Sequence, residues 1–328
     1  MRMMRVVGAW VALVLGVVFA LPGTAEASGS RDVKVERRVF PVRLSDGGTY
    51  SVVGYLYYQG SLENRPVQIL THGITYNHGY WDLPEIDGQD YSYARYMARQ
   101  HYAVLALDLP GAGESDKPNG DFLNLAESAS ALHQVAQQLR ATAQKDTFET
   151  LVYVGHSNGA LISTFAQALY GDAQAVVMTG WLNTLHSVPV SPDVIGLFLQ
   201  QGPYIRLPGE MRAPLFYDAA NADPEVIAYD NEVISDAVSR GQLMDLLIML
   251  TYPQLIPTQA LTVPVMVQLG DNDLMAPAAN AATEAQAYPN SPRVRVDPIS
   301  HTGHVFNGHY NRVEGWERID AWIRSLAR

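Results

Sequence analysis

The stretch Thr150-Leu-Val-Tyr-Val-Gly-His-Ser-Asn-Gly-Ala-Leu-Ile-Ser-Thr-Phe-Ala-Gln-Ala-Leu-Tyr-Gly171 predicts a buried strand, a tight G-x-S-x-G turn and a helix that ends at a glycine. Residues 151–154 are short, apolar and rich in valine, which is typical of a central parallel strand. After the turn, apolar residues recur at helical spacing, at Leu161, Phe165 and Leu169. Ser157 therefore lies at the joint between strand and helix.

The turn itself indicates a reactive serine. A strand that reverses directly into a helix forces the turn residue into a strained conformation, which small neighbours such as Gly155 and Gly159 accommodate. The strain exposes the hydroxyl of Ser157. The helix N-terminus beside it supplies free backbone N–H groups and partial positive charge, so an oxyanion formed there would be stabilised. Five residues alone are not specific in a chain with 26 glycines, but strand, turn and helix together are.

The first 27 residues have the pattern of a Sec signal peptide. Arg2 and Arg5 form a charged start, residues 6–21 are apolar, and Ala25-Glu26-Ala27 matches an A-x-A cleavage site. The two arginines are not adjacent, which argues against a twin-arginine signal; a retained N-terminal anchor is the alternative. We therefore expect a secreted protein that is cut after Ala27 and has no membrane span in its mature part.

The mature chain is acidic and has no cysteine. Without residues 1–27 the formal net charge changes from −11 to −12, because two arginines and one glutamate are removed. This charge opposes binding to nucleic acid or anionic membranes, and no basic run offsets it. The lack of cysteine excludes disulfides, a thiol nucleophile and thiolate metal sites. There is no H-E-x-x-H motif either, so we expect no metal and no other cofactor.

Short apolar strands alternate with helical segments along the mature chain. Strands are expected at 34–44, 49–58, 67–70, 103–107, 151–154, 175–178, 263–269 and 294–296, and helices at 93–100, 123–140, 160–170, 278–287 and 316–327. The turn signal Ser45-Asp46-Gly47-Gly48 makes the first two strands a hairpin. The repeated β-α units that follow predict an α/β fold, a mostly parallel central sheet with helices on both faces. Ligands of such sheets bind at the carboxyl ends of the strands.

One interval interrupts this alternation. About eighty residues separate the strand that ends near Thr179 from the one that begins near Val263, where two to six residues are usual. The interval contains several prolines and apolar helical stretches at 194–199 and 243–250. We expect residues 181–260 to form a lid inserted into a core made of 28–180 and 261–328. An elaboration packed away from the site is the alternative.

Four motifs resemble those of the α/β-hydrolase fold, and the likeness covers nearly all of the mature chain outside the expected lid. The first is the nucleophile elbow around Ser157. The second, Thr71-His72-Gly73-Ile74, resembles the oxyanion loop of that family and implies the backbone N–H groups of Ile74 and Asn158 as the oxyanion-hole donors. The third, from Asp108 to Ser115, resembles a strand-to-helix turn that shapes the rim without taking part in chemistry.

The fourth motif supplies the acid that orients a catalytic imidazole. A serine hydroxyl keeps its proton near neutral pH, so it needs an imidazole within hydrogen-bond reach and a carboxylate behind that imidazole. The order along the chain in this family is serine, acid, histidine. The loop Gly270-Asp271-Asn272-Asp273 resembles the family's acid loop and implies Asp273 as the acid. Asp271, which is closer to the end of the strand, is its competitor.

The same motif implies the base. After the last strand the chain reads Ser300-His301-Thr302-Gly303-His304, and the Gly-His pair implies His304, with His301 and His309 as competitors. His72 and His156 are expected to pack or to line the rim. Relatives with an aspartate nucleophile, the haloalkane dehalogenases and epoxide hydrolases, are disfavoured by serine at position 157.

The resemblance implies an exported serine hydrolase that cleaves carboxylic esters, including lactones or lipids, through an acyl-enzyme. Its substrate would be a small-molecule or lipid-like ester, and its catalytic residues Ser157, Asp273 and His304. Alternatives are acyl transfer, cyclisation or elimination with the same triad, a peptidase, and a binding protein that retains the scaffold. An aromatic cluster either lines an acyl or aryl pocket or packs in the core; its members are Tyr76, Tyr80, Trp81, Tyr91, Tyr93 and Tyr96.

Overall fold

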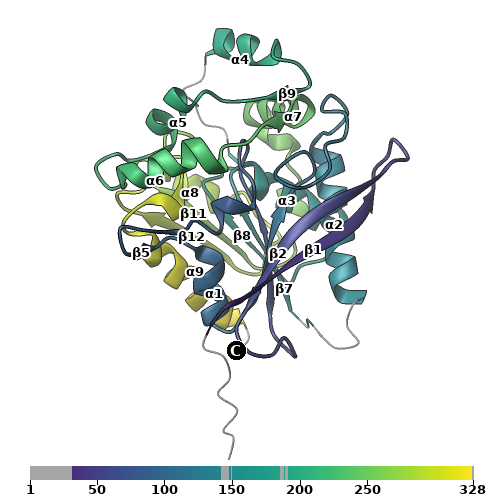
Figure 1. Cartoon of the computed structure of the whole chain (residues 1–328), viewed down its shortest axis with the longest axis vertical. Helices are drawn as coiled ribbons and strands as arrows, with labels where there is room; N and C mark the ends of the chain where they lie inside the picture. The colour runs from purple at the N-terminus through teal and green to yellow at the C-terminus, as the bar shows by residue number, and fades with distance from the viewer. Residues whose placement is uncertain (1–31, 142–147, 149, 185–187, 189–190, 327–328) are drawn as a thin grey trace, which may run out of the picture.

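An eight-stranded sheet forms the centre of the molecule in the computed structural model, which describes residues 32–141, 148, 150–184, 188 and 191–326 (Figure 1). The expected signal segment, 1–27, lies outside these residues. Within the described ranges, no helix has both the length and the apolar character needed to cross a membrane.

The sheet confirms the predicted mixture of an antiparallel entry and a parallel body. Its order is β1-β2-β6-β3-β7-β8-β11-β12. The hairpin partners β1 (Lys34–Arg43) and β2 (Thr49–Tyr58) are antiparallel, and β2 is antiparallel to β6 (Ala103–Asp108). All other neighbours are parallel: β3 (Val67–Thr71), β7 (Leu151–His156), β8 (Ala175–Thr179), β11 (Val265–Gly270) and β12 (Val294–Ile299).

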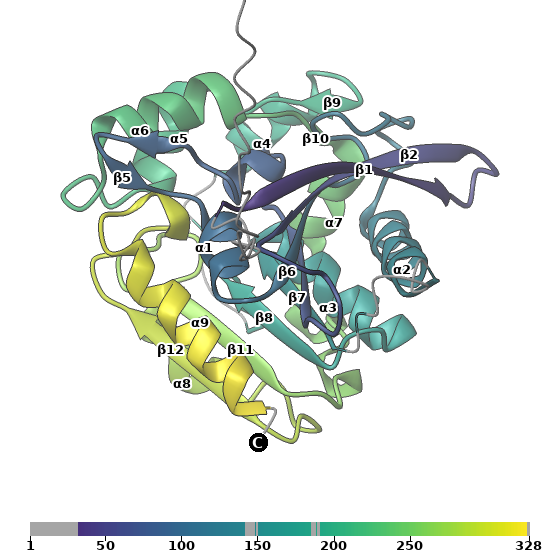
Figure 2. The same cartoon turned by 60° about the horizontal axis from the view of Figure 1, so that its bottom comes forward.

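Helices cover both faces of the sheet, as Figure 2 shows. One apolar layer lies under α2 (Leu125–Ala141), α3 (Asn158–Tyr170) and the short α8 (Ala281–Glu284). The other lies under α1 (Tyr93–Arg99) and α9 (Arg312–Leu326). Strand β7 shows why both layers form: Leu151 and Tyr153 belong to the first layer, and Val152 and Val154 to the second. Alternating side chains point to opposite faces of a strand, so a doubly covered strand is apolar throughout.

Two helices differ from the expected ranges by more than two residues at one end. The segment 278–287 contains only a 3₁₀ turn (Ala278–Asn280) and α8, since it begins after Pro277 and leads into Pro289. Helix α9 begins four residues earlier than expected, at Arg312. Gly315 in its first turn disfavours a helix by propensity, but its carbonyl accepts a hydrogen bond from Gln268 Nε2 on β11 at 2.9 Å. Tertiary contact therefore outweighs propensity here.

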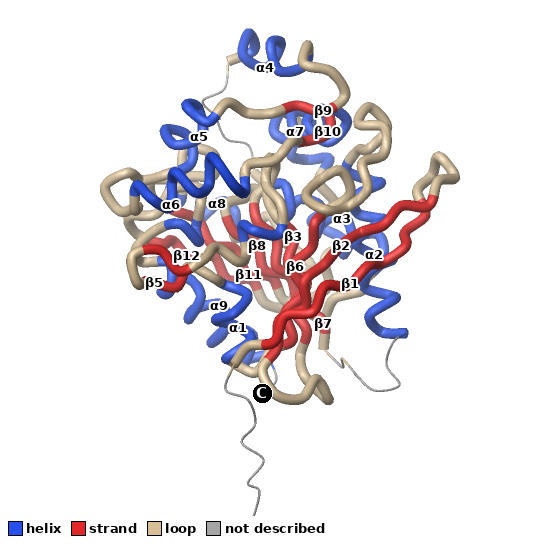
Figure 3. Tube along the Cα trace, viewed as in Figure 1, coloured by secondary structure: helices blue, strands red, loops and turns tan. Residues whose placement is uncertain are grey.

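The long interval between β8 and β11 folds as a mainly helical insertion. Its elements are α4 (Pro192–Leu199), β9 (Tyr204–Ile205), α5 (Gly209–Phe216), α6 (Pro224–Tyr229), a π-helical turn (Asp230–Ile234), β10 (Val238–Ser239), α7 (Arg240–Thr251) and two 3₁₀ turns (Pro253–Leu255, Thr258–Ala260). Figure 3 shows its helices above the strands of the central sheet. Within α4, the side chains of Val194, Leu197 and Phe198 lie outside the description. Two further short strands, β4 (Glu85–Ile86) and β5 (Gln89–Asp90), form a separate hairpin after a 3₁₀ turn (His78–Tyr80).

Candidate active site

Ser157 lies in a strained turn between β7 and α3. Its backbone has φ 51° and ψ −121°, outside the regions that non-glycine residues normally adopt. The turn is held by a hydrogen bond from the Ser157 backbone N–H to the carbonyl O of Thr179, at 2.9 Å. Close packing also explains why residue 159 is a glycine, because a Cβ at this position would lie 2.2 Å from the carbonyl O of Thr71.

Asp273 and His304 meet at the same edge of the sheet. Asp273 follows β11 and His304 follows β12, and His304 Nδ1 lies 3.1 Å from Asp273 Oδ1 and 3.0 Å from Oδ2. Both side chains are buried. Asp273 Oδ1 also accepts hydrogen bonds from the backbone N–H groups of Met275, at 2.7 Å, and Ala276, at 2.9 Å. These two hydrogen bonds hold the Asp273 carboxylate in place. Because Nδ1 of His304 faces this carboxylate, Nε2 is the ring nitrogen that is left for proton exchange.

The competing residues lie elsewhere. Asp271 is exposed, and its Oδ1 accepts a hydrogen bond from the backbone N–H of Thr302 at 3.3 Å. His301 is exposed as well, whereas His309 is fully buried. The structure therefore brings Asp273, and not Asp271, to His304.

Ser157 and His304 line one cavity of about 120 Å³, together with Ile74. Most of its wall comes from the insertion, including Leu207, Met211, Leu215, Leu243 and Leu247. The described residues of this wall include no Asp, Glu, Lys or Arg. An apolar group of a ligand would therefore be favoured here, and a charged group would lose its hydration without compensation.

The two expected oxyanion-hole residues, Ile74 and Asn158, lie in different parts of the chain near Ser157. Asn158 is the first residue of α3, where backbone N–H groups have no partner inside the helix. Its side-chain Nδ2 donates to Gln242 Oε1 on α7 at 3.1 Å, so the insertion also contacts the elbow. Ile74 lies in the loop after β3 and lines the cavity.

His309 holds His304 in place, a role that the sequence motifs did not indicate. Its Nε2 accepts a hydrogen bond from the backbone N–H of Gly303 at 3.1 Å, and its Nδ1 donates to the carbonyl O of Val305 at 2.8 Å. The two contacts bracket His304. Nε2 also accepts from the backbone N–H of Asp218, in the insertion, at 3.0 Å. Because Nε2 accepts, His309 is the neutral Nδ1–H tautomer.

His156 packs directly behind His304. Its ring stacks on Tyr80 with centroids 4.2 Å apart, and lies 4.9 Å from the ring of His304. Burial, with a smaller contribution from His304, lowers the pKa of His156 well below its usual value. Gly180, at the end of β8, leaves the room for both rings, because a Cβ there would lie 3.0 Å from His156 Cε1 and 3.2 Å from His304 Nδ1.

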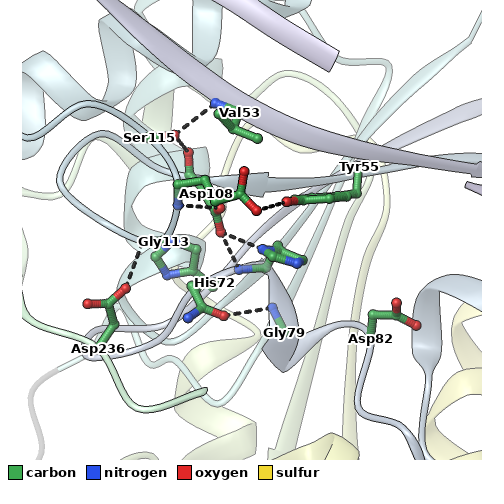
Figure 4. Close-up of polar contacts among 12 residues, drawn as sticks. Val53, Tyr55, His72, Gly79, Asp82, Asp108, Gly113, Ser115 and Asp236 are labelled. Carbon is green, nitrogen blue, oxygen red and sulfur yellow. Dashed lines mark hydrogen bonds and ion pairs between the residues drawn. The ribbon is translucent and has the colours of Figure 1, made fainter. Parts of the chain in front are cut away.

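The rim turn has a buried carboxylate at its centre (Figure 4). Asp108 Oδ1 accepts hydrogen bonds from the backbone N–H of His78 at 2.8 Å and from its Nδ1 at 2.7 Å, and Oδ2 accepts from the backbone N–H of Glu114 at 2.9 Å. These contacts lower the pKa of Asp108 although burial opposes them. His72 Nε2 accepts from the backbone N–H of Leu109 at 3.1 Å. His72 thus ties the rim turn to the oxyanion loop, and Asp108 ties it to the 3₁₀ turn at His78.

Trp181 forms part of the cavity wall and is held by a buried polar chain. Its Nε1 donates to Asn183 Oδ1 at 2.9 Å, and the backbone N–H of Asn183 donates to Glu284 Oε2 at 2.8 Å. Burial raises the pKa of Glu284, while its hydrogen bonds oppose this. Glu284 lies on α8, so this acid anchors the start of the insertion to the core.

The aromatic cluster after the oxyanion loop packs in the core. None of its members lines the cavity at Ser157. Five are buried in the apolar layer under α1 and α9: Tyr76, Tyr80, Trp81, Tyr91 and Tyr93. The core interpretation is therefore correct.

We expect the free energy of unfolding to decrease as the pH falls below about 6.5, the value for an unperturbed histidine. Burial lowers the pKa of His72, His156 and His309 in the folded state, so the unfolded chain takes up these protons first. Each such histidine then removes up to about 1.4 kcal/mol per pH unit until its folded pKa is reached. Urea unfolding at pH 7.5, 6.5 and 5.5 measures this slope. Replacement of the exposed His301 by Asn should leave it unchanged, and a flat profile would contradict the prediction.

The family of this chain follows from comparison with known proteins. The model of the alpha/beta hydrolase family matches residues 68–315, which is more than half of the chain. The chain belongs to the alpha/beta hydrolase family. A search of the curated proteins found no match.

Solved structures show the same fold at low identity. A thermophilic esterase from Thermogutta terrifontis has a TM-score of 0.62 at 20% identity, covering 89% of this chain and 98% of its own. A monoacylglycerol lipase from Paleococcus ferrophilus has a TM-score of 0.62 at 15% identity, covering 89% and 99%. A bromoperoxidase from Bacillus anthracis has a TM-score of 0.63 at 16% identity, covering 89% and 100%. These differing names show that one fold hosts several activities, so the reaction must be argued from the site.

Proposed function

We propose that this member of the alpha/beta hydrolase family is a serine hydrolase that cleaves carboxylic esters with an apolar acyl or alcohol part. One observation carries the proposal: His304 Nδ1 lies 3.0 Å from Asp273 Oδ2, while His304 and Ser157 line the same apolar cavity. A buried carboxylate behind an imidazole, next to a serine in a strained turn, is the arrangement that makes an alcohol nucleophilic.

In this mechanism Ser157 Oγ attacks the ester carbonyl carbon while Nε2 of His304 takes the hydroxyl proton. The carbonyl electron pair moves onto oxygen, and the backbone N–H groups of Ile74 and Asn158 stabilise the oxyanion. Collapse of the tetrahedral intermediate breaks the bond to the alcohol, which leaves with the proton from His304. Water then attacks the acyl-enzyme by the same route and releases the acid. Asp273 orients the imidazole and stabilises its charged form throughout.

We further propose that residues 1–27 direct export and that the insertion acts as a lid on the acyl pocket. The first proposal is supported by the charged, apolar and A-x-A pattern of the N-terminus. The second is supported by the share of the cavity wall that comes from residues between β8 and β11. An apolar wall and uncharged lining favour neutral, lipid-like esters over charged ones.

Two measurements test the enzymatic proposal. A fluorophosphonate probe should label the native protein at Ser157, and a series of p-nitrophenyl esters of graded chain length should be hydrolysed to the free acid and p-nitrophenol. Labelling without hydrolysis, with the acyl group transferred to an added alcohol or amine, would favour an acyltransferase. Absence of both labelling and turnover would reject the serine-hydrolase proposal.

The lid is tested by two neighbouring residues of α7. Leu247 lines the cavity, whereas Ile248 has 40% of its surface exposed. Leu247→Asn should lower the kcat/KM ratio of long to short acyl esters by about 5-fold or more, because each lost methylene contact is worth about 1 kcal/mol. Ile248→Asn should leave this ratio unchanged. A lower Tm with an unchanged ratio in Leu247→Asn would mean that the insertion is only structural.

A further inference from the structure

Part of the insertion contacts Thr75 and Tyr76, the two residues that follow Ile74. Here the oxyanion loop means residues 71–76, the motif Thr71–Ile74 together with these two residues. Thr75 has φ 62°, a left-handed conformation that is unfavourable for a β-branched residue. Its carbonyl O accepts a hydrogen bond from the backbone N–H of Asp236 at 2.8 Å, and its Oγ1 accepts one from Arg212 Nη1 at 2.7 Å. Both partners belong to the insertion, so a strained residue of the oxyanion loop is held from outside the core.

Arg212 is itself fixed by a second buried group. It lies on α5, is fully buried, and forms an ion pair with the equally buried Asp230. Asp230 also accepts hydrogen bonds from the hydroxyls of Tyr76, at 2.8 Å, and Tyr217, at 2.7 Å. The guanidinium lies over the ring of Tyr76, with Cζ 4.5 Å from the centroid. Arg212 and Asp230 therefore hold two consecutive residues of the oxyanion loop, Thr75 and Tyr76.

Asp236 connects the insertion to the rim turn as well. Its Oδ2 accepts a hydrogen bond from the backbone N–H of Gly113 at 2.6 Å, as Figure 4 shows. The same residue therefore contacts the oxyanion loop through its backbone and the rim turn through its carboxylate. The insertion joins two loops at the carboxyl edge of the sheet that are far apart in the sequence.

The buried ion pair between Arg212 and Asp230 is not well explained by a contribution to the stability of the fold alone. Desolvation of the two charges offsets most of their attraction, and apolar residues of similar volume often stabilise a fold equally well. Arg212 Nε has no hydrogen-bond partner among the described residues, which adds a further cost. The pair does fix the orientation of the groups around it, because a planar guanidinium with fixed donors tolerates few arrangements of its acceptors.

We propose that Arg212 and Asp230 are positioning residues for the oxyanion hole. They hold Thr75 and Tyr76 so that the backbone N–H of Ile74 stays aligned with the oxygen of the tetrahedral intermediate on Ser157. This inference rests on the proposed ester hydrolysis. It implies that the region of α5 and the π-helical turn stays attached to the core during turnover, and that any lid motion is confined to other parts of the insertion.

The first test is Thr75→Val, which keeps the shape of the side chain and removes Oγ1, the acceptor 2.7 Å from Arg212 Nη1. Only the carbonyl O of Thr75, at 3.4 Å, then remains as an acceptor on this residue. We expect kcat to fall about 10- to 100-fold, because a misaligned loop weakens binding of the transition state. Thr75 also lines the cavity, but valine keeps its volume there, so KM should change less than about twofold. The inhibition constant of an alkyl trifluoromethyl ketone, whose adduct with serine carries an oxyanion, should rise by the same factor as kcat/KM falls. A purely structural role would not link these two quantities.

The second test is the double variant Arg212→Met with Asp230→Asn, which removes both charges and leaves neither unpaired. We expect the same loss of kcat and of trifluoromethyl ketone affinity. Asp172→Asn is the matched control, since Asp172 is buried but precedes β8, at the amino ends of the strands. It should lower Tm and leave kcat, KM and the inhibition constant unchanged, with active enzyme counted by fluorophosphonate titration.

The outcomes separate this inference from the proposed function. If Thr75→Val and the double variant retain the kcat and inhibitor affinity of the native enzyme, the positioning role is overturned while ester hydrolysis stands. If Asp172→Asn loses kcat and inhibitor affinity to the same extent, the effect follows from stability and the inference is again overturned. If the native protein shows no hydrolysis that depends on Ser157, the proposed function fails and the inference fails with it.

Discussion

Ser157→Ala should abolish ester hydrolysis, with a loss of about 10⁴- to 10⁶-fold in kcat. In the proposed mechanism the hydroxyl is the group that forms the bond to the substrate. The small side chain contributes little packing, so the fold should be unchanged. A residual rate about three to four decades above that in water would remain, because the oxyanion hole still binds the transition state.

Hydrolysis of a p-nitrophenyl ester under saturating conditions measures this loss, and circular dichroism checks the fold. Ser128→Ala is a suitable control, because Ser128 is also a buried serine near the start of a helix, α2, and its hydroxyl donates to the carbonyl O of Asn124, the residue before that helix. It should retain the native rate. A Ser157→Ala enzyme with more than about a tenth of the native kcat would remove the basis of the acyl-enzyme mechanism.

The strands and the elbow could be predicted because their signals are local. Short apolar runs rich in β-branched residues placed all eight strands of the central sheet to within a few residues, and G-x-S-x-G after such a run indicated the turn at Ser157. Asp273 and His304 were implied by the resemblance to the α/β-hydrolase fold, and they lie in the loops that follow two parallel strands, β11 and β12. Carboxyl ends of parallel strands meet at one edge, so their loops lie close together.

The supporting residues could not be predicted because their partners are distant in the sequence. Arg212 lies 137 residues from Thr75, and Glu284 lies 101 residues from Asn183. A single arginine or glutamate has no periodic sequence pattern around it that would indicate burial. Residues of these types are normally exposed, so the local sequence does not show that these two side chains are buried against distant partners. His309 is the intermediate case: its proximity to His304 made it a competitor for the base, but only the backbone geometry shows that it brackets His304.

Asp273→Asn should leave a folded protein and lower kcat by about 10⁴-fold, the second-largest effect that we expect. An asparagine amide can present its NH₂ group to Nδ1 of His304. The imidazole would then carry its proton on Nε2, where it cannot accept the proton of Ser157. The loss should appear in kcat and not in KM, since Asp273 does not line the cavity.

Asp271→Asn is the matched substitution two residues away. Asp271 is exposed, and within the described part of the chain it accepts a single 3.3 Å hydrogen bond, from the backbone N–H of Thr302, so its replacement should change kcat less than about threefold. Measuring both variants at pH 8, where an unperturbed histidine is neutral, isolates the tautomer effect from protonation of the base. A large loss in Asp271→Asn with little change in Asp273→Asn would assign the acid to Asp271, and the contact between Asp273 and His304 would then be structural. A loss in neither variant would mean that His304 acts without a carboxylate, and the triad would be reduced to a serine-histidine pair.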